Sequence, residues 1–412
     1  WWRSCKSFKK HPIMKIQIPN NWFYELLFIL CIGVTYLDHF ELTFGVWSIS
    51  FLFSIARNYS ISLLKLLVPY LLIILLAFFV SFNYDHELYF MIRDITYLSK
   101  PVLGFLVGYQ LCQKNLKNSL NLLVKTAFII AICHIYILIT AVLIHKAYTV
   151  ADVRFYSGYF SDYEIYIFVL LLFHEKFGLN YSRKKLLLYT IVIGFSAFMY
   201  LARTNFIQFL ILFLALKGFF VINKKSLLVI TSIIVISVVG YSAIYHSNPR
   251  RSADGIEGFL YKLKVAPMEA FKTKINREDW VDFNDNYRSY ENIITIRTVT
   301  KDGIWPTIFG KGIGSQIDLK QEVWLGDMFL RKISILHNGF MIVLLKTGLL
   351  GIFIYLFTIT YFFRKVESDI EVIKQINLLF LGTGIFLFVS NWVFLGFYNL
   401  TEVLRLLLPL SD

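Results

Sequence analysis

Long apolar runs recur along this chain and constrain its fold more than any other feature. A helix needs roughly 20 mostly apolar residues to cross the hydrocarbon core of a bilayer. Such runs repeat from about residue 22 to the end, and the charged residues, 17% of the total, lie mainly between them. With 57% hydrophobic residues and a mean hydropathy of +0.62, the chain cannot hide its apolar side chains in one water-soluble core. The sequence therefore predicts an all-α, polytopic membrane protein.

About twelve candidate spans are expected from these runs. They lie near residues 22–38, 43–56, 62–82, 97–113, 119–144, 163–174, 185–202, 205–222, 226–245, 336–363, 375–395 and 397–410. The second, sixth and twelfth are short, and the seventh and eighth are separated only by an inferred break at Arg203-Thr204-Asn205. The chain then divides into an N-terminal membrane region, a large loop between the ninth and tenth spans, and a C-terminal membrane region. These parts cover residues 1–245, 246–335 and 336–412.

Basic residues are distributed unequally between alternate loops. Cytoplasmic loops of membrane proteins are enriched in Lys and Arg. The 174–185 loop and the N-terminus belong to a strongly basic set, whereas the opposite set holds only Arg93, Lys146, Arg154 and Arg203. We therefore expect both termini in the cytoplasm and the 246–335 loop outside. The net charge of +14 follows from this bias, and no nucleic-acid motif accompanies it, so nucleic acid is not an expected partner.

The 246–335 loop is the one segment with a soluble character. A weak helical pattern, EGFLYKLKVAPMEAFK, is interrupted by Pro267, and a stronger one, YRSYENIITIRTV, covers residues 287–299. WPTIFGKGIGSQ follows as a turn segment with Pro and Gly. It lacks the GK-[ST] ending of a phosphate loop, so its glycines are expected to permit a tight turn.

Four cationic or imidazole groups are expected at the outer face. Arg154 precedes a span, Arg203 lies at a span junction, Arg288 is on the polar face of the loop helix, and His337 stands where the chain re-enters the membrane. Charges near bilayer depth are costly and rarely lack a partner or a role. A guanidinium fork suits a phosphate or diphosphate, and an imidazole accepts a proton near neutral pH. The set predicts transfer chemistry on a lipid-linked phosphate.

Simpler interpretations of the arginines stay open. Arg154 and Arg203 could extend to lipid headgroups. Arg288 could be a solvated residue that pairs with Glu291 or Asp285.

His337 and the helix that follows it also have simpler interpretations. His337 could serve as an interfacial cap, and Lys346 could pair with an acid, line a cavity or be deprotonated. Gly348 and Gly351 are expected to allow close helix packing. No spacing of His, Cys and Asp indicates a metal site, and the four cysteines suggest no disulfide framework, so no metal or cofactor is expected.

The segment LHNGFMIVLLKTGLLG resembles the signature of the O-antigen ligase and O-antigen polymerase superfamily. In that family a His-Asn pair opens a membrane helix after a large periplasmic loop, and GLxG follows. Here His337-Asn338 is followed after nine residues by Gly348-Leu349-Leu350-Gly351. The other motifs of the family look similar in the same order, and together the specific motifs cover residues 153–164, 200–214 and 287–352. The chain departs from the pattern at Ala202, where the family has Ser, and at Ser161-Asp162, where it has Asn-Pro.

The resemblance implies metal-independent glycosyl transfer at the outer, periplasmic face of a bacterial inner membrane. The donor is a glycan on undecaprenyl diphosphate. By position, His337 activates the acceptor hydroxyl, while Arg203 and Arg288 hold the diphosphate and stabilise it as the leaving group. Asn338 orients the imidazole or the sugar, or caps the helix. Arg154, Asn338 and Lys346 are further candidates for substrate binding, together with Arg297, the second choice for the loop arginine.

Two kinds of acceptor and two other classes of function remain open. A polymerase joins one lipid-linked repeat to another, whereas a ligase transfers the chain to lipid A-core, and nothing in the sequence separates them. A transporter or flippase for lipid-linked glycans predicts internal repeats and broken helices near mid-membrane, and no repeat between the halves is visible. A scaffold subunit without chemistry predicts that His337 is dispensable.

Overall fold

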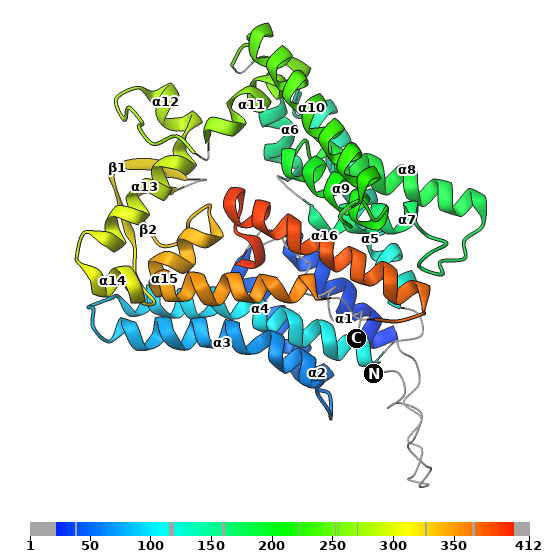
Figure 1. Cartoon of the computed structure of the whole chain (residues 1–412), viewed down its shortest axis with the longest axis horizontal. Coiled ribbons are helices and arrows are strands. Elements are labelled where there is room, and N and C mark those ends of the chain that lie inside the picture. The colour runs from blue at the N-terminus through cyan, green and yellow to red at the C-terminus, as the bar shows by residue number, and fades with distance from the viewer. Residues whose placement is uncertain are drawn as a thin grey trace.

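A computed structural model describes residues 22–398, except for positions 38, 115–118, 159–160, 222, 252, 254, 270, 326–327 and 365–366. The regular structure of this part is almost entirely helical, with one two-stranded sheet (Figure 1). The all-α class expected from the sequence is confirmed at this level.

The helices before the large loop are α1 (Trp22–Gly33), η2 (Val34–Leu37), α2 (Phe40–Ser54), α3 (Ile61–Ser81), α4 (Leu88–Lys114), α5 (Ser119–Leu143), α6 (Val150–Ser157), α7 (Asp162–Leu172), α8 (Arg183–Met199), α9 (Arg203–Leu216) and α10 (Lys224–Ser247). The loop contains α11 (Gly255–Glu269), α12 (Trp280–Asp285), α13 (Tyr287–Thr300), α14 (Ile304–Phe309), β1 (Ile317–Leu325) and β2 (Met328–Ile333). It is followed by α15 (Gly339–Ile359), η3 (Thr360–Phe363), α16 (Glu371–Val393) and η4 (Gly396–Tyr398).

Five of the described helical segments are long and apolar enough to cross a membrane. They are Ile61–Ser81, Ser119–Leu143, Lys224–Ser247, Gly339–Phe363 and Glu371–Val393. Shorter apolar helices cover Trp22–Leu37, Phe40–Ser54 and Arg203–Leu216. The chain is therefore a membrane protein by the character of its helices. Most of the last expected span, 397–410, lies outside the described residues.

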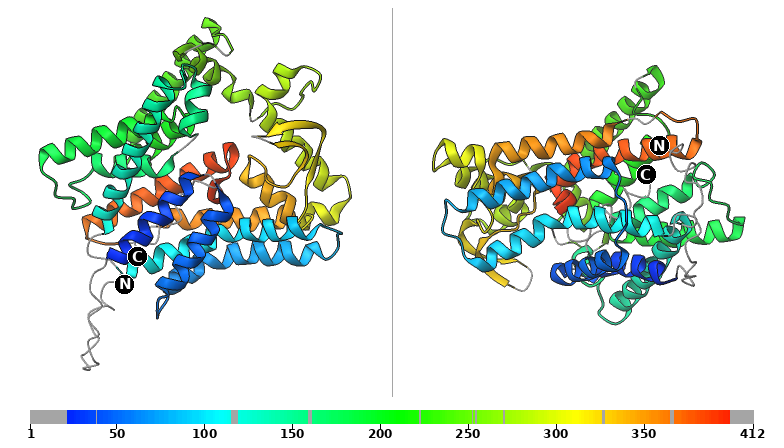
Figure 2. Two further views of the ribbon diagram at one scale, coloured as in Figure 1. Left: turned by 180° about the vertical axis from the view of Figure 1, so that it is seen from behind. Right: turned by 90° about the horizontal axis from the view of Figure 1, so that it is seen from below.

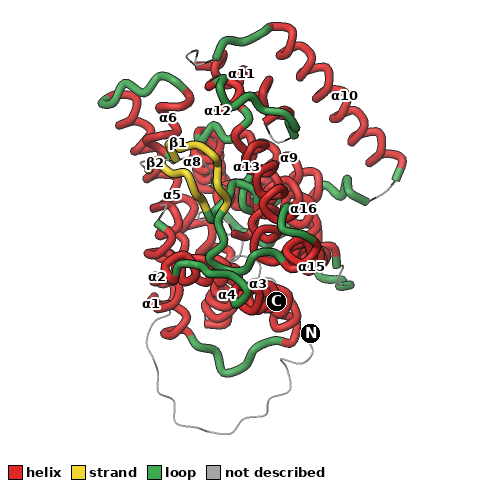
Figure 3. The backbone as a smooth tube through the Cα atoms, turned by 90° about the vertical axis from the view of Figure 1, so that its left-hand side faces the viewer, coloured by secondary structure: helices red, strands yellow, loops and turns green. Residues whose placement is uncertain are grey.

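The helices form a bundle from which α10 stands apart. α15 packs on α3, α3 on α4, and α16 on α9 (Figures 1 and 2). Tyr70 of α3 lies at the centre, with its ring centroid 5.9 Å from that of Phe105 and 6.0 Å from that of Phe397. By contrast, none of the apolar window of α10 is buried, and this helix packs chiefly on α11 (Figure 3). Among the loop elements, α13 and α14 pack on α15, and α11 packs on α10 and α6.

A break in α15 explains why two glycine motifs occur in this chain. Gly348 has a φ of +63°, which interrupts the helix. The backbone N–H groups of Lys311 and Gly312 donate to the carbonyl oxygens of Leu345 and Lys346 at 2.9 and 3.0 Å. Such a break frees carbonyl groups that must find other partners at membrane depth, and the loop after α14 supplies them.

The two backbones approach too closely for any side chain. A Cβ atom at Gly348 would lie 2.4 Å from the carbonyl oxygen of Ile308, and one at Gly310 would lie 2.4 Å from the amide nitrogen of Thr347. The tight turn expected at Gly310 and the close packing expected at Gly348 are thus one contact, whereas the atoms nearest to a Cβ atom at Gly351 belong to Thr347 and Val343 of its own helix.

The loop contains both confirmed and unexpected elements. The expected helix at 287–299 is confirmed as α13. The turn predicted for WPTIFGKGIGSQ is wrong in its first half, because residues 304–309 form the helix α14. Pro306 lies in the first turn of this helix, where a proline is tolerated. The hairpin β1–β2 was missed: Ile317 and Leu319 are buried, but a register shift between Asp318 and Val323 breaks the alternation.

Candidate active site

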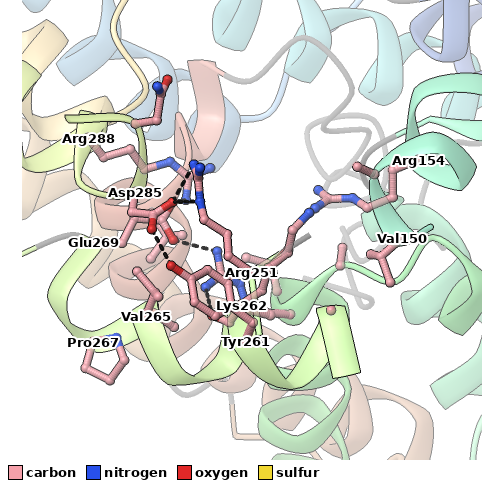
Figure 4. Close-up of a pocket in the computed structure, with 18 of the residues that line it drawn as sticks. Val150, Arg154, Arg251, Tyr261, Lys262, Val265, Pro267, Glu269, Asp285 and Arg288 are labelled. Carbon is pink, nitrogen blue, oxygen red and sulfur yellow. Dashed lines mark hydrogen bonds and ion pairs between the residues drawn. The ribbon is translucent and has the colours of Figure 1, made fainter. Parts of the chain in front are cut away.

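A cavity of about 630 Å³ lies where the loop meets the bundle (Figure 4). Its walls come from α6, α9, α11, α12 and α13, and from Val393 and Phe394 at the end of α16. These segments are far apart in the sequence. The cavity therefore exists only when the loop is folded against the membrane helices.

Cationic side chains dominate the polar lining. They are Arg154, Arg203, Arg251, Lys262 and Arg288, against the carboxylates of Glu269 and Asp285. Arg251 is neutralised by Asp285, with Nη2 and Oδ1 3.0 Å apart, and its guanidinium lies 4.6 Å from the ring centroid of Trp280. Glu269 is the carboxylate nearest to the remaining cations. Figure 4 shows Arg154 reaching in from α6, on the side opposite to Glu269 and Arg288.

Glu269 links the two arginines that were expected to bind a diphosphate. Its Oε2 lies 2.6 Å from Nη2 of Arg203, and its Oε1 lies 3.0 Å from Nη1 of Arg288. Burial alone would raise the pKa of Glu269, but Arg288 and Arg203 outweigh burial and hold it below its usual value. The two guanidinium groups therefore converge on one anionic group.

The local structure fixes Arg203 at this position. α8 ends at Met199, Leu201 adopts a φ of +50°, and α9 begins at Arg203 itself. A break was inferred here from the sequence, but it lies at residues 200–202, and Arg203-Thr204-Asn205 form the first turn of α9. Nη1 of Arg203 also donates to the carbonyl oxygen of Lys262 at 2.7 Å. The N-terminus of a helix adds partial positive charge and unpaired N–H groups, so the start of α9 favours an anion beside Arg203.

The positive charge of the cavity exceeds what Glu269 compensates. Burial, with the nearby charges of Arg154 and Arg203, lowers the pKa of Lys262 to about 8. Burial also lowers the pKa of Arg288, although Glu269 opposes this shift. Both shifts mean that the charged forms lack solvation or counter-charge. A further anion in the cavity would supply the missing counter-charge.

A buried carboxylate holds His337. Nδ1 of His337 lies 3.0 Å from both oxygens of Glu291, and the backbone N–H of His337 donates to Oε2 at 3.0 Å. Glu291 is 1% exposed, whereas the His337 side chain is 46% exposed. Since a carboxylate can only accept, Nδ1 is the donor, and Nε2 remains to accept a proton. The ring of Tyr287 meets the imidazole edge-on at 5.8 Å, and burial and Glu291 raise the pKa of Tyr287.

His337 lies beside the cavity and does not line it. Glu291 follows Arg288 by three residues on α13, so the two side chains are about one helical turn apart. Phe394 connects the two parts: its ring lies 5.3 Å from the Arg288 guanidinium, and its carbonyl accepts from the N–H of Gly339 at 3.1 Å. The cationic cavity and the histidine are thus neighbours across one wall.

Three of the candidates for substrate binding are placed elsewhere. Asn338 caps α15, with Oδ1 accepting from the N–H groups of Phe340 and Met341 at 2.9 and 3.3 Å. Arg297 is exposed, and nine residues of α13 place it about 13 Å beyond Arg288 along the helix.

Lys346 is 1% exposed and pairs with Asp94, with Nζ and Oδ2 2.5 Å apart. This is the first of the interpretations left open for it. The structure brings Arg154, Arg203 and Arg288 into the cavity, but neither Arg297 nor Lys346.

The sequence did not identify the acidic partners of the site. Arg288 was considered as a partner of Glu291 or Asp285, whereas it pairs with Glu269, and Glu291 holds His337. Lys262 was missed as well. Glu269 and Lys262 belong to the weak pattern interrupted by Pro267, and that stretch forms α11 in spite of the proline.

Protein-family models, curated proteins and solved structures contain no match to this chain. Across the residues that the structure describes, no group of three or more His, Cys, Asp or Glu side chains is arranged to hold a metal ion. What the site can do therefore follows from its own side chains: the cavity has the cationic lining that suits a multiply charged anion, and a histidine lies beside the cavity.

Proposed function

We propose that this protein transfers a glycan from a polyprenyl-diphosphate carrier to the hydroxyl group of an acceptor sugar. The observation that carries this proposal is the convergence of Arg154, Arg203, Lys262 and Arg288 on one cavity, beside a carboxylate-held His337. The resemblance of residues 336–351 to the O-antigen ligase and polymerase superfamily supports the same conclusion. Undecaprenyl diphosphate is the proposed carrier.

The arginines act on the leaving group. In the transfer, the bond between the anomeric carbon and the diphosphate oxygen breaks, and the acceptor oxygen forms the new bond to that carbon. Negative charge grows on the departing diphosphate. Arg203 and Arg288 stabilise this charge with forked N–H donors, and Arg154 and Lys262 add positive potential. This catalysis needs no cofactor.

His337 acts on the acceptor. Its Nε2 takes the proton of the attacking hydroxyl as the new bond forms. Glu291 keeps the proton of the neutral imidazole on Nδ1 and stabilises the imidazolium that results, as the aspartate does in a Ser-His-Asp triad. Glu291 is thus a positioning residue for His337.

The proposed site faces the periplasm from the bacterial inner membrane. The bias of basic residues supports a location of the loop between α10 and α15 outside, with both termini inside. The proposal keeps the expected twelve-span topology, of which five described segments have the necessary length and character. The acceptor is a second lipid-linked glycan or lipid A-core.

Replacement of His337 tests this function. In a strain that depends on this protein, His337→Ala should abolish the surface glycan at an unchanged protein level. His246→Ala is the matched control, because His246 is exposed at the end of α10, where its Nδ1 contacts the carbonyl oxygen of Ser242, and should leave output unchanged. Normal glycan output from the His337→Ala strain would eliminate the proposed mechanism.

A further inference from the structure

Glu269 occupies the place where the proposed diphosphate would bind. Each of its two oxygens contacts a different arginine, at 2.6 Å for Arg203 and 3.0 Å for Arg288. All three side chains are only about one-fifth exposed, at 20 to 22%. A diphosphate that binds the same donor atoms, Nη2 of Arg203 and Nη1 of Arg288, must therefore exchange with this carboxylate.

The backbone of Glu269 is held in place while its side chain makes these contacts. Oγ of Ser289 donates to the carbonyl oxygen of Glu269 at 3.0 Å and accepts from the N–H of Lys272 at 2.9 Å. With its backbone held in this way, Glu269 can exchange with another anion by rotation of its side chain alone.

The chemistry of the product gives this exchange a purpose. In the donor, the diphosphate is esterified at both ends, whereas in the product its terminal phosphate is free and carries more negative charge. A purely cationic cavity would hold the product more tightly than the donor. Because Lys262 and Arg154 add positive charge beside Arg203 and Arg288, this difference would be large.

We propose that Glu269 is an internal competitor for the diphosphate, which returns to Arg203 and Arg288 after transfer and promotes product release. This inference rests on the proposed function, because it needs a diphosphate as the ligand of the cavity. The inference predicts that removing this carboxylate strengthens anion binding. A purely structural role for Glu269 would not predict a stronger affinity.

Binding of farnesyl diphosphate to the purified full-length protein in detergent tests the inference. Glu269→Gln should bind this probe about tenfold more tightly than the wild type, mainly through slower dissociation, because a competing ion pair is lost. Glu269→Asp keeps the charge but is too short to bridge both arginines, so its affinity should lie between the two. Glu257→Gln is the matched control, since Glu257 is on the same helix, pairs with Arg250 at 3.0 Å and lies outside the cavity.

The outcomes separate the inference from the proposed function. If Glu269→Gln and Glu269→Asp both bind the probe as weakly as the wild type or more weakly, Glu269 only supports the arginines and the inference is wrong. The proposed function survives that result if the wild type binds farnesyl diphosphate and the Arg203→Ala variant does not. If the wild type does not bind farnesyl diphosphate, or if Arg203→Ala binds it equally well, the proposed function fails and the inference fails with it.

Discussion

At the scale of single residues, the pair formed by Glu291 and His337 gives the most specific expectation. Glu291→Gln keeps an acceptor for the N–H groups of His337 but removes the charge that stabilises the imidazolium. We expect the transfer rate at saturating donor to fall on the order of 100-fold, with little change in the KM for the donor. Steady-state kinetics of the purified variants measure this, and Glu291→Asp should recover part of the rate. An unchanged rate would show that the carboxylate only anchors the chain.

Lys262 should give the cavity a pH dependence. Its pKa is lowered to about 8, first by burial and then by Arg154 and Arg203, so the lysine is charged below pH 8 and loses its charge above it. The affinity for farnesyl diphosphate should therefore fall between pH 7 and pH 9, by about tenfold. Lys262→Met should bind more weakly at pH 7 and lack this fall.

Lys264→Met is the control for Lys262. It lies on the same helix, but its Nζ donates to Asn248 outside the cavity, so the variant should keep the wild-type pH profile. A wild-type profile in Lys262→Met as well would assign the pH dependence to another group.

At the scale of elements, the break in α15 determines where the loop attaches to the bundle. Gly348→Ala would place a side chain at a φ of +63° and 2.4 Å from the carbonyl oxygen of Ile308. We expect the free energy of unfolding to fall by ~1–3 kcal/mol, with weaker closure of the loop over the cavity.

Thermal unfolding in detergent measures the effect of Gly348→Ala. The control is the same substitution at a helical glycine that has free space around it. A Cβ atom at Gly45 of α2 would meet no other atom within 4 Å, so Gly45→Ala should be neutral or slightly stabilising. Equal stability of the two variants would contradict the role of the break.

The sequence predicted the elements whose patterns are local. The helix α13 and the break between α8 and α9 follow from short-range signals, whereas the close approach of Gly310 to Gly348 joins two motifs whose glycines were interpreted separately. The acidic partners do not follow from such signals. The carboxylate that faces Arg288 is determined by the packing of α11 against α13. The hairpin was missed for a related reason: its pairing is fixed by contacts across a register shift and not by a regular alternation.

At the scale of the whole molecule, the candidate site joins parts that the sequence keeps apart. Arg154 comes from α6, Arg203 from α9, and Lys262, Arg288 and His337 from the loop and its end. The loop is positioned by the contact of α14 with α15 and by the packing of α13 on α15. A site built in this way responds to any change that loosens the loop. A substitution at Gly348 that destabilises the protein should therefore also lower the transfer activity that depends on His337.

The pool of lipid-linked glycans in a strain that lacks this protein gives the sharpest test of the proposed transfer. Transfer at the periplasmic face predicts that glycans accumulate on undecaprenyl diphosphate on that face while the surface glycan is lost. Long accumulated chains with bare lipid A-core would identify a ligase, and single repeats would identify a polymerase. Unchanged pools, or accumulation confined to the cytoplasmic face as expected for a missing flippase, would contradict the account.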